Sequence, residues 1–178
     1  MPRQFQEVIG DLASDGSLRD FYIFGTNSSD WYRFLAFIRP HIRQDDFRVD
    51  GQVTALPPGF EEIYASRSTA SPCLSIPVGG GFLCCHFFSD SEIELDFVPG
   101  DYRTPERWAA LCSFLQDMVD LLGLPGIVTP ENRETEVIER FEPSTKGEPD
   151  GPANGSQPIR SETNPTSPAA GSLRFPLR

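Results

Sequence analysis

The sequence predicts an α+β domain in which helices pack mostly on one side of a mainly antiparallel sheet. The first observation behind this prediction is a run of three strand-like segments over residues 72–98, separated by short turn signals as in an antiparallel meander. The second is the segment that follows, residues 105–122, whose apolar residues recur at helical spacing along one stripe. A helix with a single apolar stripe needs a surface to cover, and the meander supplies one.

Local patterns assign the segments before the meander. Phe21–Phe24 is rich in aromatic and β-branched residues, which is typical of a strand. Asn27–Ser29 supply N-cap candidates for a helix that carries one apolar stripe and ends near Pro40. Asp50-Gly51 between two short β-type runs indicates a two-residue hairpin turn. The predicted elements are a helix over 5–12, a strand over 21–24, a helix over 30–39, a hairpin over 47–54 and a short helix or edge segment over 60–65.

Each strand of the meander has its own pattern. The first, residues 74–78, alternates, and Pro77 lacks the N–H that a ladder needs, which predicts a sheet edge or a bulge there. The second, residues 82–88, is apolar on both faces and is typical of a central strand. The third, residues 93–97, alternates apolar with acidic residues, so one of its faces is expected to be wet.

Capping signals bound the helix over 105–122. Thr104 is suited to cap its N-terminus, a proline occupies the first helical position, and Gly123 is suited to end it. After this helix, residues 127–128 favour a last short strand, and the acidic segment 131–142 favours a helix.

Composition divides the chain near residue 142. Residues 143–178 hold 7 of the 17 prolines and the only lysine, with a single aromatic residue. Such a segment buries too little apolar surface to offset the entropy of ordering, so we expect a disordered tail. Residues 1–142 have the length of one domain with a single core.

The charge of residues 1–142 restricts the class of partner. They carry 11 arginines, no lysine and 23 acidic residues, a net charge of −12. An acidic domain repels phosphate backbones, which argues against nucleic-acid binding and favours a basic protein partner. Solubility alone would also explain the acidity. The near absence of lysine is typical of GC-rich coding and indicates a bacterial source.

The cysteines and the N-terminus predict a cytoplasmic protein. No apolar stretch has the length of a membrane span or the form of a signal peptide. Four cysteines in apolar contexts are typical of free thiols in a reducing compartment. They are Cys73, Cys84, Cys85 and Cys112.

The first candidate for chemistry is Cys84-Cys85-His86. Strand alternation places Cys84 and His86 on one face and Cys85 on the other, with Cys73 on the neighbouring strand. Such residues bind zinc or form a Cys/His nucleophilic pair in other proteins, but the paired spacing of a structural zinc site is missing. We therefore interpret the thiols and a hydrogen-bonded histidine as residues of the core.

The second candidate is the acidic face of the third strand. Period-two spacing places Glu92, Glu94 and Asp96 side by side, as in a hard-cation site, a general acid/base pair or a docking face for a basic partner. Nuclease-type use of strand carboxylates beside a lysine is disfavoured, because the domain has no lysine. The sequence predicts no catalytic residue, no metal and no cofactor.

Three segments carry a resemblance: CLSIPVGGGFLCCHFFSDSEIELDF, TPERWAALCSFLQDMVDLLG and IVTPEN. They resemble a group of small bacterial proteins of unassigned function, in which a CHFF-type strand pair is followed by an EIEFD-type strand, a helix and a TPEN-type segment. The resemblance covers about residues 20–135 and implies one compact α+β domain without implying an activity. In size, acidity and layout the chain also resembles immunity proteins of bacterial toxin systems.

Three hypotheses for function follow. The first is a non-enzymatic, acidic protein-binding module, similar to an immunity protein, that uses Glu92, Glu94 and Asp96 to bind a basic partner. The second is a small hydrolase or metal-dependent enzyme that uses His86 with Cys84 or the nearby carboxylates. The third is a structural or scaffolding subunit with the tail as a tether.

Overall fold

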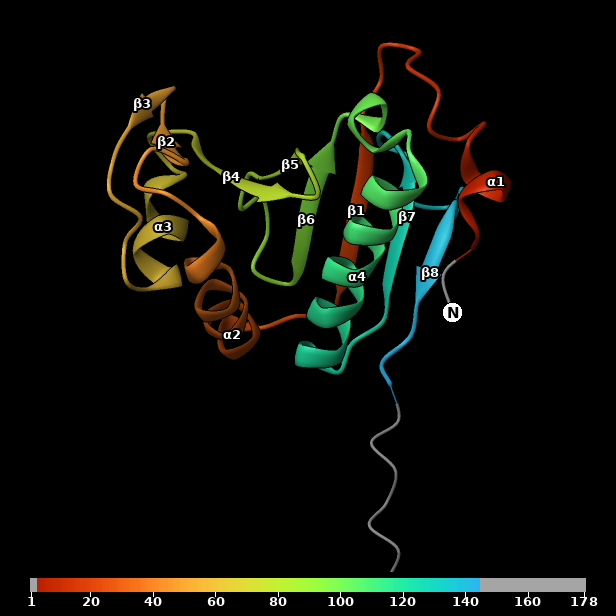
Figure 1. Cartoon of the computed structure of the whole chain (residues 1–178). Coiled ribbons are helices and arrows are strands. Elements are labelled where there is room, and N and C mark those ends of the chain that lie inside the picture. The colour runs from red at the N-terminus through yellow and green to blue at the C-terminus, as the bar shows by residue number, and fades with distance from the viewer. Residues whose placement is uncertain (1–2, 145–178) are drawn as a thin grey trace, which may run out of the picture. The chain divides into compact units, whose positions relative to one another are not determined.

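A computed structural model describes residues 3–144, so residues 145–178 of the predicted tail lie outside the described part of the chain. Within it, all strands join one eight-stranded sheet in the order β3-β2-β4-β5-β6-β1-β7-β8, and every pairing is antiparallel (Figure 1). This confirms the predicted α+β class. The strands are β1 (Arg19–Phe24), β2 (Phe47–Val49), β3 (Gln52–Val53), β4 (Pro72–Val78), β5 (Gly81–Cys85), β6 (Glu92–Phe97), β7 (Gly126–Pro130) and β8 (Glu139–Phe141).

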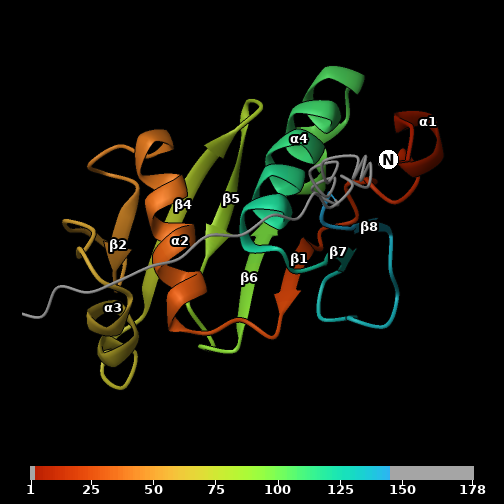
Figure 2. The same cartoon turned by 90° about the horizontal axis from the view of Figure 1, so that it is seen from below.

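The helices cover one face of this sheet. Figure 2 shows α2 and α4 on the same side, and α4 lies across β6, β1 and β7 in Figure 1. Within residues 3–144, no helix has the length and apolar character that a membrane span needs. The helices are α1 (Phe5–Val8), α2 (Ser28–Ile38), α3 (Phe60–Ser66) and α4 (Pro105–Leu122), with short 3₁₀ turns η1 (Arg39–His41) and η2 (Pro99–Tyr102).

Local signals placed α4 and the hairpin correctly. The Thr104 hydroxyl accepts a hydrogen bond from the Arg107 N–H at 3.3 Å, and Gly123 ends the helix in the left-handed region at φ 71°. Asp50 and Gly51 both have positive φ, as the predicted two-residue turn between β2 and β3 requires.

The core lies between the sheet and the helices. Phe21 and Ile23 of β1 and the matching residues of β4, β5 and β6 are fully buried under α4 and α2. At the other end of the sheet, Trp31 of α2 stacks on Phe60 of α3 with ring centroids 4.6 Å apart. Large aromatic side chains therefore fill much of the core between the sheet and the helices.

Three predicted elements are wrong in extent or type. The predicted helix over 5–12 ends at Val8. The strand predicted over 82–88 ends at Cys85, because Phe87 takes a left-handed conformation at φ 57° that breaks the ladder. The helix predicted over 131–142 is absent: β8 pairs with β7 there instead.

Pro77 lies at a partial edge, in agreement with its sequence signal. On one side β4 pairs with β5 from Leu74 to Val78, but on the other side β2 pairs only with Pro72–Leu74. The backbone position that lacks an N–H thus falls where no second strand is present among the described residues.

Gly126 of β7 allows α4 to approach the sheet closely. A Cβ placed on Gly126 would lie 2.6 Å from the Phe21 ring and 3.0 Å from a methyl group of Val119. Gly10 is a matched control, because a Cβ there would meet nothing within 4 Å.

We expect Gly126→Ala to lower the free energy of unfolding by about 1–3 kcal/mol, because the added methyl overpacks the contact between β7 and α4. Gly10→Ala should change it by less than about 0.5 kcal/mol. Urea denaturation of both variants measures this, and equal stability of the two would contradict the packing described here.

Candidate functional site

The candidate site is the open face, which we define as the side of β4, β5, β6 and β1 that points away from α2 and α4. Alternation along β6 buries Ile93, Leu95 and Phe97 under the helices and leaves the residues between them on this face. The open face carries side chains of all four strands and of the segment after β5. They are Ser75 of β4, Cys84 of β5, His86 and Phe88 just after β5, Glu92, Glu94 and Asp96 of β6, and Asp20, Tyr22 and Phe24 of β1.

Sheet register brings acidic residues of two strands together at the centre of this face. Asp96 lies directly opposite Asp20 of β1 on one side and opposite Cys84 of β5 on the other. Glu94 lies opposite Tyr22 in the next row. The predicted face of Glu92, Glu94 and Asp96 is therefore extended by residues that are distant in the sequence.

Tyr22 lies between two carboxylates. Its hydroxyl oxygen is 3.0 Å from Asp20 Oδ2 and 3.2 Å from Glu94 Oε1, and the Asn132 N–H donates to the same Asp20 oxygen at 2.8 Å. A tyrosine hydroxyl has one hydrogen and satisfies one carboxylate at a time. Asp20 therefore has two neighbouring donors, whereas Glu94 competes with it for the hydroxyl hydrogen.

Burial and mutual repulsion act on these carboxyl groups. Burial raises the pKa of Asp20, and the charges of Asp96 and Glu131 add to this effect. Burial also raises the pKa of Glu94, reinforced by the charge of Asp20. The ionised form of each of these carboxyl groups is thus less favourable in the folded protein than in water, because the group is partly desolvated and lies near other negative charges.

His86 is held by Asp96. Its Nε2 atom lies 2.8 Å from Asp96 Oδ2, and this hydrogen bond raises the pKa of His86 despite partial burial. The imidazole also stacks on Phe88, with ring centroids 5.1 Å apart. In residues 3–144 no hydrogen bond joins His86 to Cys84, so the ring is oriented toward the carboxylate rather than toward the thiol.

The interpretation of all these thiols and His86 as core residues is wrong in part. Cys85 is fully buried on the helix side, as expected, but Cys84 and Cys73 are only half-buried on the open face. The side chain of His86 is 36% exposed. The reason is that none of the helices within residues 3–144 covers this side of β5, so alternation alone did not decide which residues are in the core.

Exposed aromatic rings border the acidic centre. Tyr22 stacks on Phe24 with ring centroids 5.3 Å apart, and Phe24 is 40% exposed. On the opposite side Phe88 is 54% exposed, and Phe82 is 52% exposed near the turn between β4 and β5. Three phenylalanines thus reach solvent on a face whose middle is acidic.

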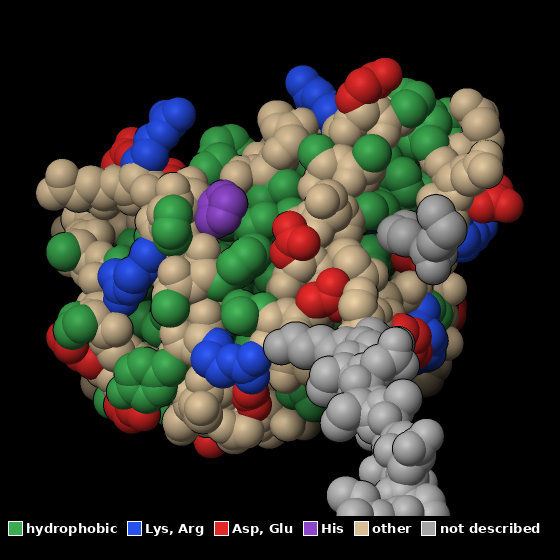
Figure 3. Space-filling view, turned by 60° about the horizontal axis from the view of Figure 1, so that its bottom comes forward, with side chains coloured by type: hydrophobic (Ala, Val, Ile, Leu, Met, Phe, Trp, Pro, Cys, Tyr) green, Lys and Arg blue, Asp and Glu red, His purple; other side chains and the backbone are tan. Residues whose placement is uncertain are grey.

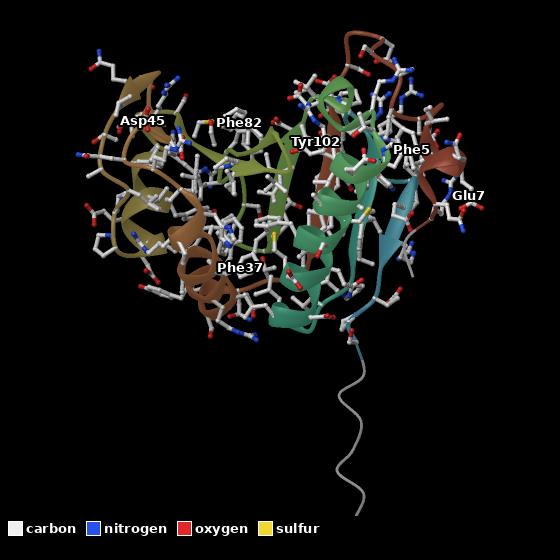
Figure 4. All side chains as sticks on the ribbon, viewed as in Figure 1. Phe5, Glu7, Phe37, Asp45, Phe82 and Tyr102 are labelled. Carbon is white, nitrogen blue, oxygen red and sulfur yellow. The ribbon has the colours of Figure 1, made fainter. Side chains whose placement is uncertain are left out.

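Two hollows flank this centre. A hollow of about 450 Å³ lies beside Tyr22 and Phe24, where Val137 and Arg140 form part of its wall. A second of about 350 Å³ lies between the loop that carries Asp45 and the exposed ring of Phe82, which Figure 4 shows at the same end of the sheet. The open face is therefore uneven, with concave regions on both sides of the carboxylates.

Sequence reasoning missed Asp20 and Tyr22. The strand-like run Phe21–Phe24 was recognised, but its neighbours in the sheet were not predictable from its own residues. The available signal was the alternation of polar Asp20 and Tyr22 with apolar Phe21 and Ile23.

Within residues 3–144, no group of three or more histidine, cysteine or acidic side chains is arranged to hold a metal ion. A scan against protein-family models and comparisons with curated proteins and with solved structures found no match for this chain.

We expect Glu94→Gln to raise the free energy of unfolding at pH 7 by about 0.5–1 kcal/mol. This is less than the roughly 1.4 kcal/mol that corresponds to one pKa unit, because solvent screens the charges of the site. The glutamine retains an oxygen that accepts from Tyr22 and removes the charge that repels Asp20. Because the pKa of Glu94 is raised in the folded state, the stability difference should shrink as the pH falls through that pKa. Urea denaturation, with exposed Asp117→Asn as the control, measures this; a destabilised Glu94→Gln would contradict it.

We expect the pKa of His86 to lie above 6.5 and to fall in Asp96→Asn, because the carboxylate stabilises the imidazolium. A raised pKa means that this stabilisation is fully present below 6.5 and is lost as the pH rises through the folded-state pKa. Asp96→Asn should therefore lower stability more at about pH 6 than at about pH 8.5. NMR titration of the His86 ring and denaturation at both pH values measure this, and an unchanged His86 pKa in the variant would refute it.

Proposed function

We propose that this chain is a non-enzymatic protein-binding module whose open face binds a basic segment of a partner protein. The observation that carries the proposal is that Asp20, Glu92 and Glu94 have no arginine or lysine within ion-pair distance in the described part of the chain. Elsewhere arginines do pair with acids. These pairs are Arg3–Asp11, Arg19–Asp15, Arg33–Asp30 and Arg133–Glu136.

Uncompensated carboxylates favour a cationic ligand on electrostatic grounds. The carboxylates of Asp20 and Glu94 repel each other and are partly desolvated, so part of the cost of removing water from them has already been met in the free protein. A guanidinium or ammonium group bound beside the two carboxylates would relieve the repulsion. The complementary charge would also speed association with a basic partner.

The aromatic border suits the same ligand. Phe24 and Phe88 offer exposed ring faces on the two sides of the acidic centre, and cationic side chains bind such faces through cation–π interactions. Aromatic residues, phenylalanine included, are also enriched in the buried centres of protein interfaces. Charge and apolar area thus occur together on the open face.

The acids of the helix side differ from this arrangement. In Figure 3, which looks onto the side that carries α2 and α4, acidic side chains occur singly among hydrophobic ones. Glu62 of α3 and Asp117 of α4 are both exposed there and serve as matched controls.

The resemblance to immunity proteins supports a basic toxin as the partner, met in the cytoplasm of a bacterium. In that setting the module would act by covering a basic surface, and it would need no catalytic group.

We expect an alternating arginine–glycine peptide to bind the open face and a glutamate–glycine peptide of equal length not to bind. The Glu92→Gln/Glu94→Gln double variant should weaken binding of the arginine peptide by about tenfold, because it removes two unpaired charges from the face. Backbone NMR shift changes locate the site, and a titration of these shifts gives the Kd.

The control is Glu62→Gln/Asp117→Asn, which removes the same net charge from the helix side and should leave the Kd within about twofold. Equal weakening by the two double variants would show that only net charge matters and would refute a specific face. Shift changes centred on α2 or α4 would also refute it.

A further inference from the structure

Two of the four cysteines meet on the open face, beside the acidic centre. Ser75 of β4 lies directly opposite Cys84 of β5, so Cys73, two residues before Ser75, is a diagonal neighbour of Cys84 on the same face. Their thiol groups are close enough to influence each other's ionisation, and both are half-buried. Cys85 and Cys112 are buried in the helix-side core.

The surroundings of Cys84 stabilise a thiolate. The neighbouring Cys73 thiol and Ser75 hydroxyl favour the ionised form of Cys84, and a protonated His86 adds positive charge. These groups lower the pKa of Cys84 to about 7, against the opposing effects of burial and of the Asp96 charge. The neighbouring Cys84 and burial raise the pKa of Cys73, which stays a thiol. Cys84 is thus the sulfur prepared as the nucleophile, and Cys73 is the thiol beside it.

We propose that Cys84 and Cys73 form a peroxide-sensitive thiol pair, in which Cys84 is oxidised first and Cys73 closes a cross-strand disulfide. The Cys84 thiolate attacks one oxygen of hydrogen peroxide, the O–O bond breaks, and the other oxygen leaves as hydroxide and takes up a proton to become water. The Cys73 sulfur then attacks the sulfenic sulfur of Cys84. The S–S bond forms, the S–O bond breaks, and the leaving hydroxide combines with the proton of the Cys73 thiol as a second water. Peroxide is reduced and the two thiols are oxidised.

The first step prepares the second. When Cys84 becomes a neutral sulfenic acid, the negative charge that raised the pKa of Cys73 is gone, so Cys73 ionises more readily. The resolving thiol is therefore activated only after the first thiol has reacted.

The strand ends allow the sulfurs to approach. Diagonal neighbours in a sheet lie farther apart than directly opposed residues, so a disulfide needs a small shift of the strands. Cys73 is next to the first residue of β4, and β5 ends at Cys85, just after Cys84. The ladder between β4 and β5 ends at the Leu74–Cys85 pair, so Cys73 lies just beyond its last pair. The shift has to be accommodated by the pairing of Cys73 with Arg48 of β2 and of Cys84 with Asp96 of β6.

The test is peroxide treatment of the reduced full-length protein, followed by alkylation of free thiols and mass spectrometry. Trypsin would leave Cys73, Cys84 and Cys85 in one peptide between Arg67 and Arg103, so chymotrypsin, which cleaves after Phe82, is used. At pH 7 we expect Cys84 to be oxidised roughly tenfold faster than an ordinary thiol, and the Cys73 and Cys84 peptides to become linked by a bond that a reductant breaks. Cys112 should stay reduced.

Two variants separate the steps. In Cys73→Ser the sulfenic acid of Cys84 has no resolving thiol, so it should accumulate and be trapped by dimedone. In Cys84→Ser, oxidation of Cys73 should slow by roughly tenfold. Cys112→Ala, far from the pair, should be oxidised like the wild type, and circular dichroism checks that each variant is folded.

Three results would overturn the proposal. They are oxidation of Cys84 no faster than of Cys112, a disulfide to Cys85 rather than Cys73, and unchanged oxidation of Cys73 in Cys84→Ser.

Discussion

The structure depends on the packing of α4 against one face of the sheet. The helix buries its apolar stripe on β6, β1 and β7. Gly126 has no side chain, so Val119 of the helix can pack close to β7 and to Phe21 of β1. Burial of this kind is the main favourable contribution to folding. Because α2 lies on the same side as α4, the helices of the described residues cover only one face of the strands. Every second residue of β5, β6 and β1 therefore faces the other way, onto a surface that these helices do not cover.

That uncovered surface has a chemistry unlike that of a sheet face selected for stability alone. Its centre holds carboxylates that raise one another's pKa, with the Tyr22 hydroxyl between Asp20 and Glu94. Four arginines pair with acids elsewhere in the described residues, although a basic residue at this centre would relieve the repulsion. Retention of unfavourable charges at one place is expected where they serve binding, because function and stability compete for the same residues.

The same one-sided packing separates two adjacent cysteines. Cys85 points into the core and is chemically protected, whereas Cys84 points to the open face, beside Cys73 and near Asp96. A thiol pair at the border of an acidic binding surface would couple the two proposals. A disulfide between β4 and β5 would alter the surface next to His86 and Phe88, so oxidation would change the shape presented to a basic partner.

Several features were predictable from local sequence. The caps and stripe of α4, the Asp50-Gly51 hairpin and the shared face of Glu92, Glu94 and Asp96 each depend on neighbouring residues only, since capping, turn geometry and strand alternation act over a few positions. The wrong predictions share a cause, which is that contacts with residues far away in the chain overrode the local pattern. Residues 131–142 have an acidic pattern that favours a helix, yet they return along the sheet and form β8, and the Asn132 N–H donates to Asp20.

By itself, then, the sequence determined which residues share a face of each strand, because alternation is a property of the extended backbone. Only the tertiary structure decided which face is covered and which strands are neighbours. It placed Asp20 and Tyr22 of β1 beside β6, and it left Cys84 and His86 half exposed on the side that α2 and α4 do not cover. Strand order and helix placement depend on contacts between residues far apart in the chain, and no local pattern records them.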